Sequence, residues 1–217
     1  MALTVLLTGF GPFPGAPSNP TGPLVQRLAR LRRPALCDVR LVPHVFQTSY
    51  EVVDRELPRL LAEVKPDAVL MFGLSARASC LRIETRARNA VSALIRDVEG
   101  RQAALHCIVP GGPDALPFDV PAARLARAAR RARVQALISR DAGRYLCNYL
   151  CWRASESVSR PGGPKFAAFI HVPGLGPAAQ RRRSGEARWW RMPDLLRGAE
   201  AILLAAAAET RKRRQVK

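Results

Sequence analysis

The sequence contains no apolar run close to the ~20 consecutive residues that a helix needs to cross a bilayer. Its apolar opening, residues 1–10, lacks a charged flank and runs directly into a stretch rich in glycine and proline. This pattern predicts a buried strand and not a signal peptide. We therefore expect no membrane partner.

Motifs for nucleotides and metals are also missing. The glycines spell neither GxGxxG nor a P-loop, so nothing favours a nucleotide cofactor. The five cysteines are odd in number and irregularly spaced, which favours a reducing cytoplasm over a disulfide framework. One metal alternative stays open, because Cys147 and Cys151 lie one helical turn apart and could share a zinc ion with His171. Our expectation is a protein without cofactor or metal.

Acidic residues are scarce, with 17 Asp and Glu against 35 Lys and Arg, for a formal net charge of +18. The basic excess falls mainly after residue 120 and consists mostly of arginine. No zinc-finger spacing, helix-turn-helix signature or RNP-like aromatic pattern accompanies it. We expect at most non-specific association with nucleic acid or other polyanions. A basic polyanion-binding protein remains an alternative, which would depend on Arg181, Arg182 and Arg183 or on the basic tail.

The chain of 217 residues is long enough for one sizeable α/β core and short for two domains. Apolar periodicity predicts strands and helices that alternate along it. The expected strands are 3–8, 37–42, 68–73, 134–139 and 165–172, with short strands or a hairpin in 80–109; the expected helices are 21–32, 50–64, 120–133, 149–158 and 192–210. This order predicts a three-layer α/β/α fold, with a mainly parallel twisted sheet and helices on both faces. We predict a single domain over residues 1–217 that ends in a frayed basic tail at about 211–217.

The segment DAGRYLCNY, residues 141–149, places a cysteine at a strand-to-helix junction. It follows the predicted buried strand 134–139, so Cys147 falls at the start of the next helix or one turn inside it. A helix N-terminus carries unpaired N–H groups and about half a positive charge, and that environment favours the thiolate nucleophile over the thiol. The alternative is that Cys147 is a small buried core residue.

Two further side chains would complete a catalytic set with Cys147. His171 lies near the end of the predicted strand 165–172, and Glu84 lies among arginines in 80–109. Taken alone, such a histidine is more often structural, and such a glutamate is more often a surface carboxylate. Together the three form a nucleophile, a base and a carboxylate that orients the base, if all meet at the carboxyl edge of one sheet.

The loop after the first strand, residues 9–20, is dense in glycine and proline and therefore has a fixed, non-helical shape. Ligands of open α/β sheets bind at the carboxyl ends of strands, where this loop lies. We predict that Phe10 and Phe13 form apolar walls of a pocket. The alternative is that they only close the edge of the core.

With these motifs in place, the chain resembles the pyroglutamyl peptidase I (pyrrolidone-carboxylate peptidase) family of cysteine peptidases. The similarity runs in order through nearly the whole chain, and its most specific parts are 141–149 and FIHVP at 169–173. The other matching segments are LLTGFGPF at 6–13 with Asn19-Pro20, Glu84-x-x-Ala87-x-Asn89 and Asp97-x-Glu99-Gly100.

The resemblance implies an omega-peptidase that hydrolyses the bond after an N-terminal pyroglutamate in peptides. In that case Cys147 is the nucleophile, His171 the general base and later acid, and Glu84 the residue that orients His171. The implied substrate-binding residues are Phe10, Phe13, Asn19, Leu74, Tyr145 and Leu146. Pyroglutamylated peptides are then the partners, and assembly into a homodimer or homotetramer is left open.

The chain departs from the family pattern at two places. The family's Gly-Gln-Ala-Gly-Gly is Gly-Leu-Ser-Ala-Arg here, at residues 73–77, and Leu94 stands where many members have an arginine thought to assist the oxyanion. Arg96 follows two positions later, and on a strand we expect it to substitute only if the register shifts. A second hypothesis is therefore a catalytically weakened member that still binds pyroglutamyl-type ligands.

Overall fold

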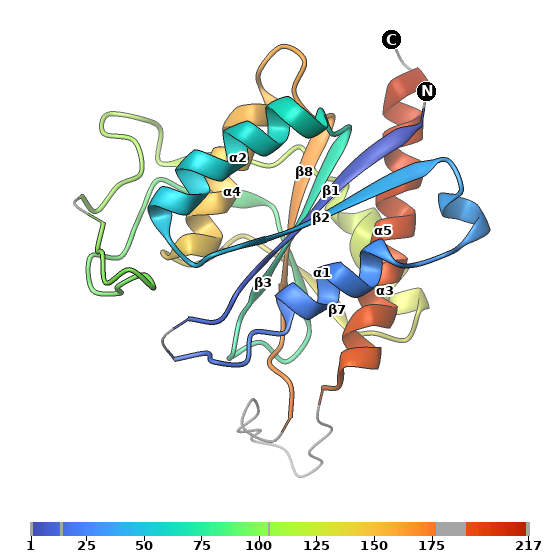
Figure 1. Ribbon diagram of the computed structural model, residues 1–217, viewed down its shortest axis with the longest axis horizontal. Helices are drawn as coiled ribbons and strands as arrows, with labels where there is room; N and C mark the ends of the chain where they lie inside the picture. The colour runs from blue at the N-terminus through green and yellow to red at the C-terminus, as the bar shows by residue number, and fades with distance from the viewer. Residues whose placement is uncertain (1, 14, 104, 177–189, 216–217) are drawn as a thin grey trace.

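The computed structural model describes residues 2–13, 15–103, 105–176 and 190–215 (Figure 1). A six-stranded sheet in the order β2-β1-β3-β8-β4-β7 runs through its centre. The strands are β1 Leu3–Phe10, β2 Val39–Phe46, β3 Ala68–Leu74, β4 Leu81–Glu84, β7 Ala136–Ser139 and β8 Phe166–Val172. Strands β5 (Arg86–Arg88) and β6 (Ala115–Pro117) form a separate antiparallel pair.

The sheet is mainly parallel, as predicted, but its last two strands are reversed. Strands β2, β1, β3 and β8 run in one direction, while β4 pairs antiparallel with β8 and parallel with β7. The segment that contains β4 was expected to form short strands or a hairpin; short strands do form there, but the expectation did not include that β4 joins the central sheet. A strand of four residues offers too little periodicity to reveal this long-range pairing.

Helices cover both faces of the sheet, which confirms the three-layer α/β/α prediction. Figure 1 shows α1 (Thr21–Ala29), α3 (Ala122–Arg131) and α5 (Met192–Gln215) on one side, and α2 (Tyr50–Val64) and α4 (Leu146–Val158) on the other. Successive strand residues alternate between these two cores, as Val5 and Leu6 do. Phe169 belongs to the core under α2 and α4, so His171, two residues further on β8, points to that same face. No helix of the described residues is long and apolar enough to cross a membrane.

Strand β7 is a correction to the buried strand expected at 134–139. It begins at Ala136 and lies at the edge of the sheet. The side chains of Leu137 and Ile138 are 43% and 47% exposed, because no further strand or helix covers that edge among the described residues. An apolar run therefore predicted the strand correctly but not its burial.

The frayed tail was also predicted wrongly for residues 211–215, where α5 continues to Gln215. Arginines in its last turns form ion pairs with acidic residues far away in the sequence, and these contacts tie the helix end to the sheet. The pairs are Arg211 with Asp38, Arg213 with Asp119, and Arg214 with Asp67. Much of the positive charge of the tail is thus already paired. Arg181, Arg182 and Arg183, on which the polyanion hypothesis also depends, lie outside the described residues.

Candidate active site

Cys147 is the second residue of helix α4, the position that the sequence predicted. The residue before the helix, Tyr145, is extended and supplies no side-chain cap. The first N–H groups of a helix have no partner within it, so those of Leu146 and Cys147 remain available to an anion. The thiol therefore lies beside two backbone donors and the positive end of a helix.

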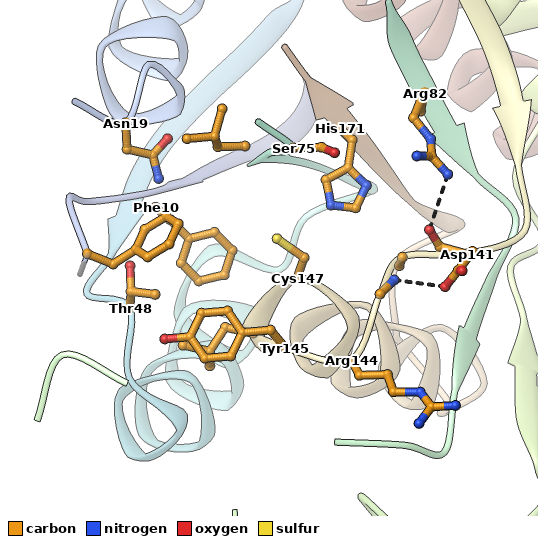
Figure 2. Close-up of a pocket in the computed structure, with 15 residues that line it drawn as sticks. Phe10, Asn19, Thr48, Ser75, Arg82, Asp141, Arg144, Tyr145, Cys147 and His171 are labelled. Atoms are coloured by element: carbon orange, nitrogen blue, oxygen red, sulfur yellow. Dashed lines mark hydrogen bonds between the residues drawn. The ribbon is translucent and has the colours of Figure 1, made fainter. Parts of the chain in front are cut away.

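His171 and Glu84 form a buried pair beside this cysteine. The Nδ1 atom of His171 lies 2.8 Å from Oε1 of Glu84, and the two residues are 6% and 0% exposed. With Nδ1 engaged, the other ring nitrogen is left for Cys147. Figure 2 shows the Cys147 sulfur and the His171 ring next to each other in the pocket.

Glu84 reaches His171 in a way that the sequence did not predict. It was expected at the carboxyl edge of a parallel sheet, but β4 runs against β8, with Arg82 opposite His171 and Glu84 opposite Phe169. The carboxylate therefore approaches the imidazole diagonally across two antiparallel strands, a distance that long side chains span.

The buried carboxylate of Glu84 has compensating partners in addition to His171. Its Oε2 accepts a hydrogen bond from the backbone N–H of Asp141 at 3.2 Å, and the guanidinium of Arg82 lies 3.7 Å from its Oε1. A buried charge is tolerated when it is paired and hydrogen-bonded in this way. The bond to Asp141 also ties β4 to the loop that leads into α4.

The charge of His171 follows from these neighbours. Burial lowers the pKa of its imidazole, but hydrogen bonding and charge from Cys147, and then from Glu84, outweigh burial and raise the pKa to about 9. The ring is therefore protonated at neutral pH when it faces a thiolate. The arrangement favours a thiolate–imidazolium pair, the reactive form of a cysteine nucleophile.

Cys147 and His171 line a cavity of about 290 Å³, a size suited to a small ligand, and the buried Glu84 lies behind His171. Every substrate-binding residue predicted from the sequence lines it: Phe10, Phe13, Asn19, Leu74, Tyr145 and Leu146. Further lining residues that the sequence analysis did not single out are Thr48, Ser75, Arg82, Asp141, Ala142, Gly143 and Arg144. The predicted residues thus come together, and the sequence missed mainly the polar part of the wall.

One side of the cavity is aromatic. The ring of Phe13 lies 6.1 Å from that of Tyr145, and Tyr50 packs edge-on against Tyr145 at the same distance. Phe10 is only 2% exposed and continues this wall into the core, where it packs on Phe46. Flat apolar walls of this kind suit a small neutral ring better than a charged group.

Asn19 mainly fixes the shape of the loop between β1 and α1. Its Nδ2 donates to the carbonyl of Gly11 at 3.0 Å, and its Oδ1 accepts from the backbone and hydroxyl of Thr21. One hydrogen of the amide remains for a ligand. Thr21 is the first residue of α1, and its backbone N–H and hydroxyl both donate to Asn19.

The zinc alternative does not fit this geometry. Among the described residues, no three His, Cys, Asp or Glu side chains are grouped so that they could hold a metal ion. Cys151 is completely buried, and burial raises the pKa of its thiol well above the usual value. It is a core residue one turn further into α4, away from the pocket that Cys147 lines.

Comparison with known proteins tests the resemblance to the pyroglutamyl peptidase family. Residues 3–193 match the family model described as pyroglutamyl peptidase. The chain belongs to this family. It is 36% identical over 172 residues to a pyrrolidone-carboxylate peptidase of Pyrococcus furiosus. These aligned residues are 79% of this chain and 81% of the relative. A pyrrolidone-carboxylate peptidase 1 of Ralstonia nicotianae is 34% identical over 98% of this chain and 94% of its own.

Solved structures of the family have the same fold. A mutant pyrrolidone carboxyl peptidase from Pyrococcus furiosus superposes with a TM-score of 0.83 at 29% identity, over 95% of this chain and 99% of that one. The pyrrolidone carboxyl peptidase of Fervidobacterium islandicum gives a TM-score of 0.83 at 26% identity, over 94% and 98% of the two chains. The predicted fold class and family are both confirmed.

The departure at Leu94 is resolved differently from what we expected. Residues 89–97 form no strand, and Leu94 is 90% exposed. The guanidinium of Arg96 donates to the carbonyl of Gly100 at 2.8 Å, so it does not replace the arginine of other family members by a register shift. The arginines that do line the pocket are Arg82 on β4 and Arg144 in the loop before α4.

Gly73 on β3 makes room for the nucleophile. A Cβ atom added at this position would lie 2.8 Å from the Cys147 sulfur and 2.5 Å from Cζ of the Phe169 ring. Neither contact is compatible with normal packing, so a side chain here would displace the sulfur or the ring. The sequence showed Gly73 only as part of the family stretch, although a glycine inside a buried strand is itself a sign of close approach.

We expect Gly73→Ala to lower the rate of Cys147 alkylation and any turnover by about 10²-fold, because a displacement of the reacting atom by 1 Å costs about that much. The rate of alkylation by iodoacetamide measures this, and the melting temperature shows whether the fold survives. Gly11→Ala is the control, since its Cβ would meet nothing nearer than 3.7 Å. An alkylation rate equal to that of the wild type in Gly73→Ala would show that the sulfur is not confined there.

Proposed function

We propose that this protein removes N-terminal pyroglutamate from peptides by a thiol mechanism, with Cys147, His171 and Glu84 as its catalytic triad. The observation that carries the proposal is the buried 2.8 Å pair of His171 and Glu84 beside a cysteine at a helix N-terminus. Family membership supports the same chemistry. Pyrrolidone-carboxylate peptidase is the name that the relatives carry.

In the acylation step, the Cys147 thiolate attacks the carbonyl carbon that follows the lactam ring. The oxyanion that forms accepts hydrogen bonds from backbone N–H groups at Cys147 and Leu146, a stabilisation worth about 3 kcal/mol per donor in a dry site. The imidazolium of His171 then donates its proton to the departing amine as the C–N bond breaks. The products are a free peptide amine and a pyroglutamyl thioester on Cys147.

In the deacylation step, neutral His171 takes a proton from water, and the resulting hydroxide equivalent attacks the thioester. The C–S bond breaks, pyroglutamate leaves, and the thiolate–imidazolium pair is restored. Glu84 keeps the ring in the same tautomer and orientation through both steps. The lactam ring is neutral, and the aromatic wall and the remaining Asn19 hydrogen supply the contacts that such a ring needs.

Release of a fluorophore from a pyroglutamyl-amide reporter tests the proposal. We expect turnover that disappears after alkylation of Cys147. The same fluorophore on alanine should not be released, because its charged amine has no place against the aromatic wall. Purified folded protein that releases no fluorophore would reject the peptidase.

The second hypothesis, a binder without catalysis, depends on Leu74, which lines the pocket where other members carry an amide side chain. It predicts that a pyroglutamyl peptide raises the melting temperature without being hydrolysed. The remaining expectations are also proposals: action in the cytoplasm, no cofactor, and assembly into a dimer or tetramer.

The pH dependence of turnover should reflect His171, whose pKa is raised to about 9. The imidazolium supplies the proton of the leaving amine, so we expect kcat on an amide substrate to fall as pH rises through about 9. The same proton stabilises the fold: that contribution is complete below the ordinary pKa of 6.5 and is lost as pH rises through about 9. A pH–rate profile and a pH series of melting temperatures check both statements. Constant kcat up to pH 10 would contradict the assignment of His171 as the acid.

A further inference from the structure

The half of the pocket that lies across Cys147 from the aromatic wall is basic. Its charged lining residues are Arg82, Asp141 and Arg144. Figure 2 shows Arg82 and Asp141 on the His171 side of the pocket, with Phe10, Asn19 and Thr48 on the opposite side. The pocket therefore has two chemically different halves, with the nucleophile between them.

Further guanidinium groups gather on the segment that leads into this half, Ser139 to Asp141. Arg82 donates to the Ser139 hydroxyl at 2.8 Å, and Arg86 donates to the carbonyl of Arg140, also at 2.8 Å. Arg88 lies 3.6 Å from a carboxylate oxygen of Asp141. The carboxylate of Asp141 also accepts from the backbone of Gly143 at 3.0 Å. Asp141 and the buried Glu84 are thus the two acids that face the three arginines. The mouth of the pocket therefore carries a net positive charge.

Arg82 is the arginine best placed to bind an anion. Its side chain is 32% exposed, yet its Nε atom is buried and has no hydrogen-bond partner. The nearest acid, Glu84, lies at 3.7 Å, beyond a hydrogen bond, and its carboxylate already binds His171. Nε is buried and Nη2 donates to Ser139, so the donors left for a ligand are those of the exposed part of the guanidinium, which can make a charge-assisted hydrogen bond to a carboxylate.

The position of a substrate follows from the reaction. A thiolate that attacks the scissile carbonyl has the acyl group on one side and the leaving amine on the other. The neutral lactam belongs in the aromatic half, so the residue after pyroglutamate extends into the half that Arg82 and Arg144 line. We propose that these two arginines make the enzyme prefer pyroglutamyl peptides that carry a carboxylate on that next residue. The inference rests on the proposed function.

The carboxylate could come from an Asp or Glu side chain or from the free C-terminus of a dipeptide. We expect kcat/KM for pyroglutamyl-Glu-amide to exceed that for pyroglutamyl-Gln-amide by about tenfold at low salt, the effect of a charge-assisted hydrogen bond. Comparing pyroglutamyl-Gln, which has a free C-terminal carboxylate, with pyroglutamyl-Gln-amide tests the second source. The ratios should shrink as salt rises, because the groups are partly exposed.

Arg82→Gln and Arg144→Gln should each lower these ratios toward one. Arg59→Gln is the matched control, since it removes the same charge from α2 far from the pocket lining, where Arg59 faces Glu63. The readout is a ratio between two substrates, so a general loss of activity in Arg82→Gln does not imitate the effect. Equal kcat/KM for the Glu and Gln amides in the wild type would overturn the inference and leave the peptidase intact. If both arginine variants keep the wild-type ratio of kcat/KM for the Glu and Gln amides, the preference does not come from Arg82 and Arg144.

Binding of the same peptides to Cys147→Ala, measured by calorimetry, separates recognition from chemistry. A tighter Kd for the Glu than for the Gln amide supports the inference even if the wild type hydrolyses neither peptide, an outcome that would reject only the proposed function. Equal Kd values, or no binding of either peptide, would overturn the inference.

Discussion

Replacing Cys147 by alanine or by serine is expected to lower turnover of a pyroglutamyl amide by 10⁴-fold or more, with the fold intact. Alanine removes the attacking atom. Serine retains a nucleophile, but its hydroxyl holds its proton far more tightly than a thiol, and the site is arranged around an easily formed anion. Steady-state kinetics with a pyroglutamyl reporter, together with melting temperatures, measure the effect.

Cys151→Ser provides the matched control for this prediction. Cys151 lies one turn further along α4 and is fully buried, so its replacement tests whether thiol loss in this helix is damaging by itself. We expect most of the activity to survive, with some loss of stability because a hydroxyl replaces a buried thiol. An equal loss of turnover in the Cys147 and Cys151 variants would mean that disturbance of the helix, and not loss of the Cys147 thiol, lowers activity.

Replacing His171 by alanine should be nearly as damaging, with a loss of about 10³-fold or more in kcat/KM. The variant loses the proton donor for the leaving amine and the cation that faces the thiolate. Alkylation of Cys147 should therefore slow in parallel with turnover. That joint loss distinguishes a catalytic histidine from one that only fills the core.

Glu84→Gln should cost less than His171→Ala. The glutamine retains a hydrogen-bond acceptor for Nδ1 of His171, and only the charge that helps to raise the pKa of His171 disappears. The pH at which kcat falls should accordingly move below 9. Unchanged pH dependence in this variant would show that the pair acts only through orientation.

The sequence predicted best the strands that are buried along their whole length and the helix with a regular apolar face. Strands β3 and β8 are continuous apolar runs because helices cover both of their faces, and α2 begins and ends at the predicted residues. Strand β4 was missed as a member of the sheet, because its pairing with β8 joins residues 87 apart in the case of Glu84 and His171. Local periodicity carries no information about such a partner.

The site followed from chemistry more than from spacing. Cys147, His171 and Glu84 were individually weak candidates, and the structure places them together. Arg82 was overlooked, although it lies two residues before Glu84 on one strand and so projects from the same face. A glycine inside a buried strand indicates a close approach at Gly73, but its partners could not be predicted, because the Cys147 sulfur and the Phe169 ring come from other elements.

The most direct test of the central claim is to find the pyroglutamyl group on Cys147. A pyroglutamyl ester with an activated leaving group makes acylation fast, so the thioester should accumulate and survive an acid quench. Mass spectrometry with fragmentation of the peptide that contains both helix cysteines should place one pyroglutamyl group on Cys147 and none on Cys151, with no adduct in Cys147→Ala. Hydrolysis of the ester without a Cys147 adduct, at a rate that Cys147→Ala retains, would contradict the account.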